Sequence, residues 1–146
     1  MKIKFIVMSS LIITINLFII SCNGNTEPQV CISGNCVNVE IADTQNERNF
    51  GLMFRENLDE NSGMIFIYEE SDTYAFWMKN TLIQLDMIWI NEDKIIIYIA
   101  EAEPCKADPC PTYAPEEPAK YILEVNQGFS QEHDINVGDK VKSKGI

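Results

Sequence analysis

Residues 85–99, with the sequence LDMIWINEDKIIIYI, decide how this chain folds. Two apolar runs, 85–90 and 94–99, are rich in aromatic and β-branched residues, and the polar residues 91–93 between them have the composition of a tight turn. This pattern predicts a β-hairpin. Because residues 95–97 are three consecutive isoleucines, we expect the second strand to be covered on both faces rather than to lie at an exposed edge.

Further strands are expected on both sides of this hairpin. Residues 37–41 alternate between apolar and polar or small side chains, as does the run 121–125, and this period of two is typical of half-buried strands. The apolar runs 64–68 and 74–78 also predict strands, separated by a turn at 69–72. The chain is expected to end in a terminal strand after a turn at Asn136 to Asp139.

Two short helices complete the expected fold. Thr44 and Glu47 have the spacing of a capping box, which predicts a helix running through Phe50 and Met53 with these two side chains on its buried face. Residues 126–133 permit a second short helix. With six or seven strands, we predict an α+β, predominantly β domain: a compact barrel-like or sandwich-like sheet with two short helices.

The amino-terminal residues predict where the protein is located in the cell. Lys2 and Lys4 precede an apolar run, and the tetrapeptide 19–22, Ile-Ile-Ser-Cys, resembles the lipobox of bacterial lipoproteins. That resemblance implies cleavage before Cys22 and a lipid on its sulfur, which anchors the protein to a membrane. The alternative is an uncleaved transmembrane helix, but polar residues interrupt the run and no basic stop-transfer cluster follows it.

The predicted organisation has three parts. Residues 1–21 form a lipoprotein signal peptide, 22–30 a lipidated amino terminus and flexible tether, and 31–146 a single β-rich domain. The expected location is the cell envelope, facing the periplasm or the cell surface. The formal net charge of −11 disfavours nucleic acid as a partner, because nucleic-acid affinity comes largely from basic side chains that neutralise phosphates.

Cysteine spacing agrees with an exported protein. If Cys22 is lipidated, four cysteines remain, and Cys31/Cys36 and Cys105/Cys110 form two closely spaced pairs. Four cysteines permit three connectivities, and short separations favour two local disulfides. A four-thiolate zinc site and redox-active thiols are the alternatives. The second pair lies in the proline-rich stretch 103–118, which we expect to be an ordered loop.

Several segments resemble a widespread prokaryotic family, domain of unknown function 192. The segments are GLMFR at 51–55, GMIF at 63–66, FWMKNT at 76–81, LDMI at 85–88 and CKADPCP at 105–111. The resemblance runs from about Val39 to Val141 and implies the β-rich fold and often an exported location. It implies no established reaction. The Cys31/Cys36 pair is not part of the family pattern.

Polar side chains near the aromatic strands are the first candidates for a site. Lys79 and Asn80 follow an aromatic strand and enter a loop, where site residues often lie. Asp86 lies inside a strand, so its charge requires a cationic or hydrogen-bonding partner, and Lys79 and Arg55 are the nearest candidates. Such a group is either a buried ion pair that fixes the fold or a ligand-binding or catalytic site.

Aromatic side chains supply further candidates. Trp77 and Tyr113, with Tyr74 and Trp89, could form a platform for a sugar or an apolar ligand, although most aromatic residues in such strands pack in the core. The methionines are expected to pack there too, rather than to bind copper. His133 is the only histidine, so conventional nucleophilic machinery is sparse, and we predict neither a metal nor a cofactor.

The sequence therefore supports three hypotheses. The first is a lipid-anchored envelope protein that binds a small molecule, a polymer or a protein through Arg55, Trp77, Lys79, Asn80, Asp86 and Tyr113. The second is a small envelope enzyme, such as a hydrolase, that uses Asp86 with Lys79 or Arg55. The third is an interaction module without a ligand pocket, for which a contiguous exposed apolar patch would be the sign.

Overall fold

The predicted hairpin lies at one side of the main sheet. The computed structural model describes residues 27–146 of the chain. In it, β5 (Leu85–Ile90) pairs antiparallel with β6 (Ile96–Ala102), so the hairpin is confirmed. All six residues of β5 are buried, because the sheet is covered on both faces at this strand.

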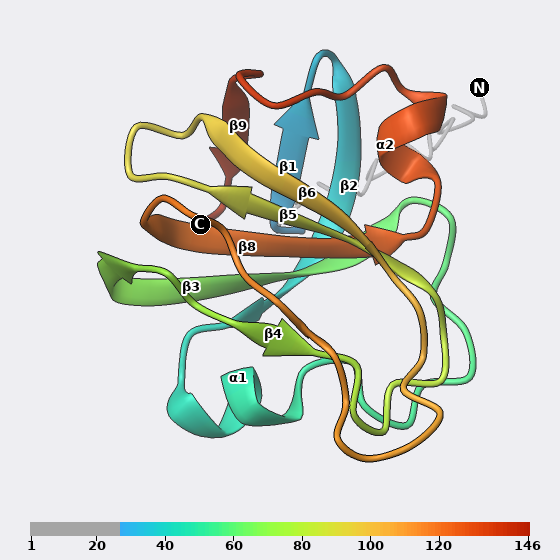
Figure 1. Cartoon of the computed structure of the whole chain (residues 1–146). Coiled ribbons are helices and arrows are strands. Elements are labelled where there is room, and N and C mark those ends of the chain that lie inside the picture. The colour runs from blue at the N-terminus through green and yellow to red at the C-terminus, as the bar shows by residue number, and fades with distance from the viewer. Residues whose placement is uncertain (1–26) are drawn as a thin grey trace, which may run out of the picture.

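The sheet has seven strands and curls strongly. The strands follow the order β6, β5, β8 (Ala119–Asn126), β3 (Ser62–Asp72), β2 (Asn35–Ala42), β1 (Gln29–Ile32) and β9 (Val141–Lys144). Only the pair β2 and β3 is parallel. Figure 1 shows the sheet curled into a half-barrel. Its two edges meet at a single bridge between Ile95 and Lys140.

A second, two-stranded sheet and two short helices complete the described part of the chain. The small sheet pairs β4 (Phe76–Trp77) with β7 (Thr112–Tyr113). α1 (Gln45–Phe50) lies beside β4 at one end of the molecule, and α2 (Phe129–Glu132) lies at the opposite end (Figure 1). The predicted fold class, predominantly β with a barrel-like sheet and two short helices, is confirmed.

Two apolar clusters pack on opposite faces of the curled sheet. The first lies inside the half-barrel and includes Ile88 and Leu123 with Phe129 of α2. The second lies between the outer face of the sheet and the layer made by α1, β4 and the 103–118 loop, and it includes Trp89 and Ile122. Because successive residues of a strand point to opposite faces, β5 and β8 contribute to both clusters.

Three local expectations were wrong. β6 is covered on both faces, as expected, but it is an edge strand of the main sheet, although the segment before it bonds to residues 138–141 across the curl. The expected turn at 69–72 is strand, because β3 continues past an irregularity and pairs Asp72 with Ala119. The run 74–78 yields only the two-residue β4.

The capping box is present, but the helix it begins is shorter than expected. The hydroxyl of Thr44 accepts from the Glu47 amide at 3.3 Å, and the Glu47 carboxylate accepts from the Thr44 amide at 3.0 Å. The helix ends at Phe50 because Gly51 takes a positive φ of 49°. α1 therefore has no buried residue, and Leu52 in the following turn is buried in place of the expected face.

The predicted signal peptide and lipid attachment at Cys22 lie outside the described residues. Within residues 27–146, no helix has the length and apolar character needed to cross a membrane. Both expected cysteine pairs are disulfides, Cys31–Cys36 and Cys105–Cys110, so the zinc and free-thiol alternatives do not apply to these four residues. The first closes the hairpin of β1 and β2, and the second closes part of the 103–118 loop.

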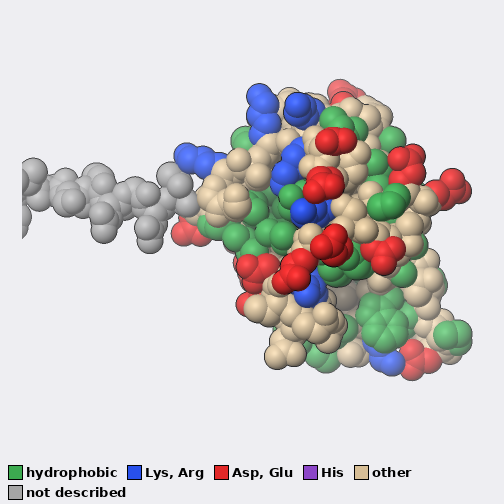
Figure 2. All heavy atoms as spheres, turned by 90° about the vertical axis from the view of Figure 1, so that its left-hand side faces the viewer, with side chains coloured by type: hydrophobic (Ala, Val, Ile, Leu, Met, Phe, Trp, Pro, Cys, Tyr) green, Lys and Arg blue, Asp and Glu red, His purple; other side chains and the backbone are tan. Residues whose placement is uncertain are grey.

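On the face shown in Figure 2, acidic and basic side chains are interspersed with hydrophobic ones. The acidic excess of the chain is therefore not gathered into a single patch on this face.

Candidate functional site

Asp86 is buried, as expected, but its partners are backbone amides. Its side chain is on the inner face of the sheet and the residue is only 1% exposed. Oδ1 accepts from the Gly128 amide at 3.1 Å, and Oδ2 accepts from the Ser130 amide at 2.8 Å. These amides lie at the start of α2, whose cap residue Gly128 has no side chain to accept from them. Asp86 therefore caps α2 from a neighbouring strand.

The two expected partners of Asp86 bind elsewhere. Arg55 forms a two-pronged ion pair with Glu40, with N–O distances of 2.5 and 2.6 Å. This pair lowers the pKa of Glu40 and raises that of Arg55. Lys79 pairs with Asp108 at 3.5 Å. The predicted grouping of Asp86 with Lys79 or Arg55 was therefore wrong, because each of the three has its own partner.

Asn80 holds the loop after β4 through its backbone. Its φ is +57°, and its carbonyl accepts from the Phe54 amide at 2.8 Å, while Phe54 also has a positive φ of 63°. A bulky residue rarely adopts this conformation. The ring of Phe54 is 59% exposed and lies 6.1 Å from that of Phe50, so the corner presents two aromatic rings to solvent.

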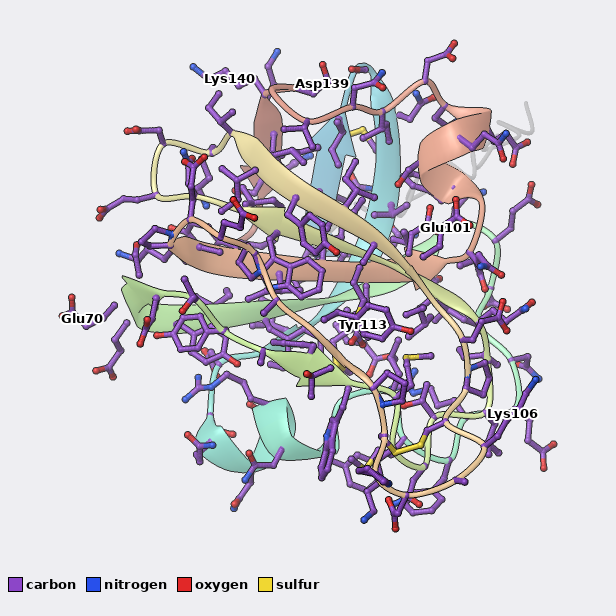
Figure 3. All side chains as sticks on the ribbon, viewed as in Figure 1. Glu70, Glu101, Lys106, Tyr113, Asp139 and Lys140 are labelled. Atoms are coloured by element: carbon purple, nitrogen blue, oxygen red, sulfur yellow. A yellow bond between two sulfur atoms is a disulfide. The ribbon has the colours of Figure 1, made fainter. Side chains whose placement is uncertain are left out.

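The four aromatic candidates do not form a platform. Trp89 is completely buried and donates through Nε1 to the Tyr74 carbonyl at 2.9 Å. Tyr74 stacks on Tyr68, and Tyr113 pairs with Phe76 across the small sheet and packs on the outer core. In Figure 3, Tyr113 lies over the middle of the molecule. Trp77 alone of the four is more than one-third exposed, at 48%.

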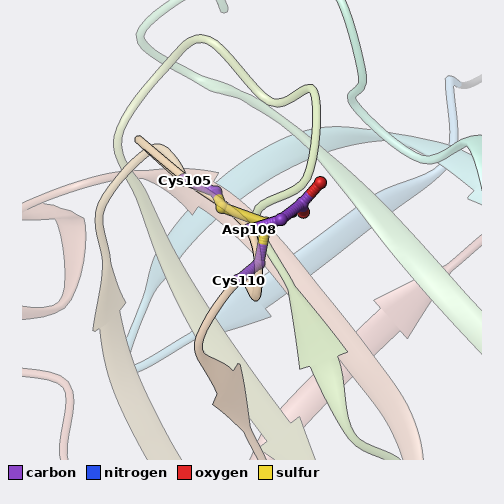
Figure 4. A group of neighbouring side chains, drawn as sticks. All are labelled: Cys105, Asp108 and Cys110. Carbon is purple, nitrogen blue, oxygen red and sulfur yellow. A yellow bond between two sulfur atoms is a disulfide. The ribbon is translucent and has the colours of Figure 1, made fainter.

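The second cysteine pair lies beside an acidic side chain. Cys105, Asp108 and Cys110 are adjacent in Figure 4, and their sulfur and carboxylate atoms lie within 4.8 Å of one another. The sulfurs are joined in a disulfide, which removes the thiolates that would bind a metal. The disulfide closes the part of the 103–118 loop between residues 105 and 110.

A cavity of about 230 Å³ opens between α1, the residues after it, and β4. The outer face of the sheet contributes Phe66, Tyr68 and Glu124, and Ala75, Phe76 and Trp77 form another part of its lining. The remaining lining comes from the segment 48–53 and from Thr81. Of the six predicted site residues, only Trp77 lines this cavity, and Lys79 lies next to it with Nζ 5.4 Å from the Trp77 ring centroid.

Glu124 is the most unusual group in the cavity. It lies on β8 opposite Met64 of β3 and Met87 of β5, and it is only 5% exposed. Within residues 27–146 no group donates a hydrogen bond to its carboxylate, and burial raises its pKa to about 8. The carboxyl group is therefore mainly protonated at neutral pH and lines the cavity as a neutral acid.

Arg48 supplies the one cationic side chain that lines the cavity within the described part of the chain. Its guanidinium lies 4.8 Å from the centroid of the Tyr68 ring, and one terminal nitrogen donates to the carbonyls of Asp43 and Ile67. Its Nε is buried and has no acceptor. Burial raises the pKa of Tyr68, so its hydroxyl is neutral at neutral pH. Arg48 is thus fixed by its terminal nitrogen but retains an unused donor.

Two glycines allow close approaches of the chain near the cavity, one in its lining and one beside Glu124. A Cβ on Gly51 would lie 3.2 Å from the Phe66 ring, and the positive φ there turns the chain away from α1. A Cβ on Gly63 would lie 2.5 Å from the Glu124 carbonyl, which is too close for any other residue. Gly63 therefore lets β3 and β8 approach at the position of the buried acid.

The sequence contained an unused signal for Glu124. In the run 121–125 it shares a face with Ile122, a core residue with 0% exposure, so the alternating pattern places an acid where an apolar side chain is expected. Arg48 gave no comparable signal, because charged residues are common in short exposed helices. Its role depends on the tertiary contact of its side chain with the Ile67 carbonyl and the Tyr68 ring of β3.

These features define a class: a small β-rich domain with a cavity of about 230 Å³ that contains a buried acid without a charged partner. The family DUF192, described as "Uncharacterized ACR", matches residues 28–143. The chain belongs to this family, as its motifs indicated. The match begins before Val39, so it extends over the segment that contains the Cys31–Cys36 hairpin.

Relatives and solved structures agree with this assignment. A UPF0127 protein of Pyrococcus abyssi is 29% identical over 71% of this chain and 84% of its own length. A UPF0127 protein of Pyrococcus furiosus is 26% identical over 73% of this chain and 86% of its own.

A solved protein of unknown function from Novosphingobium aromaticivorans is 35% identical, with a TM-score of 0.72, covering 78% of this chain and 83% of its own. Another solved structure, from Sinorhizobium meliloti, is 31% identical to this chain and has a TM-score of 0.74. The match covers 82% of this chain and 95% of the other protein's chain.

Proposed function

We propose that this protein is a lipid-anchored ligand-binding protein of the cell envelope, and that its ligand occupies the cavity beside α1. The observation that carries the proposal is the carboxyl group of Glu124, buried in the cavity without a hydrogen-bond partner among the described residues. A buried polar group without a partner costs free energy, and such groups cluster at functional sites.

The lining suits a small organic ligand. Ligand sites are typically apolar and aromatic with a few polar groups that fix orientation. Here Phe66, Phe76 and Trp77 supply aromatic surface, while Glu124 and Arg48 supply polar groups. The exposed rings of Phe50 and Trp77 are both part of the lining, so apolar surface continues from the cavity to the solvent.

The same carboxyl group supports a second candidate function. An acid with a pKa near the working pH can donate and accept a proton during a reaction. Glu124, with a pKa of about 8, has this property, whereas Asp86 is occupied by two amides. Turnover of a bound ligand that is lost in Glu124→Gln while binding persists would favour an enzyme over a binding protein.

The envelope location is supported by the amino-terminal sequence and by the two disulfides, which persist in oxidising compartments. Fractionation of cells that express the full chain tests it. We expect the protein in the membrane fraction and Cys22→Ala in the soluble fraction or retained as an unprocessed precursor. A wild-type chain recovered from the cytosol without fatty-acid label would contradict this part of the proposal.

Ligand binding is tested by blocking the mouth of the cavity. Ala75 lines the cavity and is exposed, so Ala75→Trp should obstruct it at little cost in stability. The matched control is Val137→Trp, which adds similar bulk at a residue that is 60% exposed and is not part of the lining.

In a fragment screen by protein NMR, we expect hits to shift the amide signals of residues 48–53 and 75–77. These shifts should disappear in Ala75→Trp but persist in Val137→Trp. A screen in which no fragment perturbs these signals would contradict the proposed function.

A further inference from the structure

The polar groups in the cavity have an imbalance of hydrogen-bonding capacity. Arg48 contributes donors only, and its buried Nε has no acceptor. Glu124 lines the same cavity, is 95% or more removed from solvent, and is mainly protonated at neutral pH, so it offers a hydroxyl donor. Both groups can therefore donate to a ligand, and the Arg48 Nε has no acceptor among the described residues.

Arg48 and Glu124 do not satisfy each other. The ion pairs of the described chain are Arg55–Glu40, Lys79–Asp108 and Lys120–Glu92, and none includes Arg48 or Glu124. A cation and an acid that line one cavity without pairing are both open to a group that occupies the cavity. A carboxylate fits this role because it carries two acceptor oxygens and one negative charge.

The charges around the cavity also favour an anion over a cation. The fixed positive charge of Arg48 would repel an ammonium group, and it already covers the ring of Tyr68 that could otherwise attract one. Glu124 is the only carboxylate in the lining, too few oxygen ligands for a calcium or magnesium ion.

The apolar side chains of the lining indicate what the uncharged part of the ligand would be. Phe66 and Phe76 meet edge to face, with ring centroids 4.8 Å apart, and Trp77 and Leu52 add further apolar surface. These groups offer no charge and would favour an aliphatic or aromatic segment.

We infer that the ligand of this cavity is a small organic carboxylate with an apolar body, whose oxygens accept hydrogen bonds from Arg48 and Glu124. This inference rests on the proposed function, because it identifies the chemical class that the same cavity binds. It also implies a pH dependence, since ionised Glu124 loses its donor and repels the ligand. The titratable or charged side chains that share the cavity with Glu124 are Arg48 of α1 and Tyr68 of β3, and its neighbours on the adjacent strands are Met64 and Met87.

Three probes of matched shape test the chemical class: phenylacetate, phenylacetamide and 2-phenylethylamine. They should be titrated into the full chain in detergent, by calorimetry and by NMR, with detergent alone as the blank. At pH 6.5 we expect phenylacetate to bind at least about tenfold tighter than the other two, because charge-assisted hydrogen bonds are the stronger ones. Its affinity should fall at least about tenfold between pH 6.5 and pH 9.5, as Glu124 ionises.

Variants assign the effect to the two donors. Arg48→Met should weaken phenylacetate about tenfold or more and leave phenylacetamide much less affected, whereas the same substitution at Arg55, which pairs with Glu40, serves as the control. Because Arg48 also bonds two carbonyls, Arg48→Lys provides a variant that keeps the charge if Arg48→Met does not fold. Glu124→Gln should abolish the pH dependence of phenylacetate binding.

The outcomes separate the inference from the proposed function. If 2-phenylethylamine or phenylacetamide binds in the cavity as tightly as phenylacetate, the chemical class is wrong and the binding function stands. A pH dependence of phenylacetate binding that survives in Glu124→Gln would also overturn the inference. If no probe and no library fragment shifts the signals of residues 48–53 and 75–77, the proposed function itself fails.

Discussion

Two buried acids on neighbouring strands have opposite surroundings. Asp86 of β5 pairs with Val125 of β8, and Glu124 is the residue before that partner, so the two acids lie in adjacent rows of the sheet on opposite faces. Asp86 points into the half-barrel and accepts from two amides of the α2 turn. Glu124 points to the outer layer, where no described residue donates to it.

This contrast separates a structural acid from a candidate functional one. Both residues are at least 95% buried, so burial alone does not distinguish them. The difference is whether the fold supplies hydrogen-bond donors. An acid with two amide partners stabilises the element that offers them, whereas an acid without partners and beside a cavity is available to a ligand.

Removing the structural acid should have the largest effect on stability. Asp86→Ala leaves the amides of Gly128 and Ser130 buried without acceptors, and we expect it to lower the free energy of unfolding by about 4 kcal/mol. Thermal and urea unfolding measure this loss. Asp86→Asn, which retains one acceptor oxygen, should lose less. An Asp86→Ala protein that keeps its stability and fails only in ligand binding would contradict the structural role of Asp86.

Glu124 should make stability depend on pH in the opposite sense from an ion-paired acid. Its pKa is raised from 4.5 to about 8, so between these values the folded chain keeps a proton that the unfolded chain has released. Stability should therefore be greatest at the acidic end of this window and fall by a few kcal/mol as pH rises to about 8.

Urea unfolding at pH 5, 6.5 and 8 measures this slope. In Glu124→Gln the side chain cannot ionise, so this part of the slope should disappear while the rest of the pH profile remains. An identical slope in wild-type and variant proteins would show that Glu124 is not the group responsible.

A moderate effect is expected at the helix that forms part of the cavity wall. Thr44→Ala removes both hydroxyl bonds of the capping box and should cost about 1 kcal/mol. Because α1 carries Arg48, hydrogen exchange at residues 45–50 should increase as the helix opens more often. Thr44→Ser, which keeps the hydroxyl, is the matched control, and equal exchange in both variants would contradict this role of the cap.

The smallest effect is expected at the predicted Lys79 site. Lys79 pairs with Asp108 at the surface, where such pairs contribute about 0–1 kcal/mol. Lys79→Ala should therefore change the free energy of unfolding by less than about 1 kcal/mol and affect probe binding less than Arg48→Met does. A loss of probe binding equal to that of Arg48→Met would move the site to the Lys79 and Asn80 corner.

The fold was largely predictable because its signals are local. The hairpin at 85–99, the capping box at Thr44 and the alternating strands are read from neighbouring residues, and each is present. The pairing order was not predictable, because β8 lies between β5 and β3 although the chain reaches it after β6. The edge position of β6 depends on that order, and its isoleucines gave no information about it.

The candidate site was only partly predictable for the same reason. Trp77 was identified as an aromatic platform candidate, but Arg48 joins the cavity because its side chain reaches β3 and donates to the Ile67 carbonyl. Asp86 was correctly predicted to be buried and partnered, but its partners are amides 42 and 44 residues away. A sequence shows that a buried acid needs a donor, but the tertiary structure decides which one.

The most direct test of the account is the titration of the Glu124 side chain. Carbon-13 NMR of the carboxyl group follows its ionisation in the folded protein, and Glu124→Gln assigns the signal. We predict a midpoint near the raised pKa of about 8, which shifts upward when phenylacetate binds. A midpoint close to the ordinary glutamate value of 4.5 would contradict the claim that this acid is buried, neutral and without a partner in the cavity.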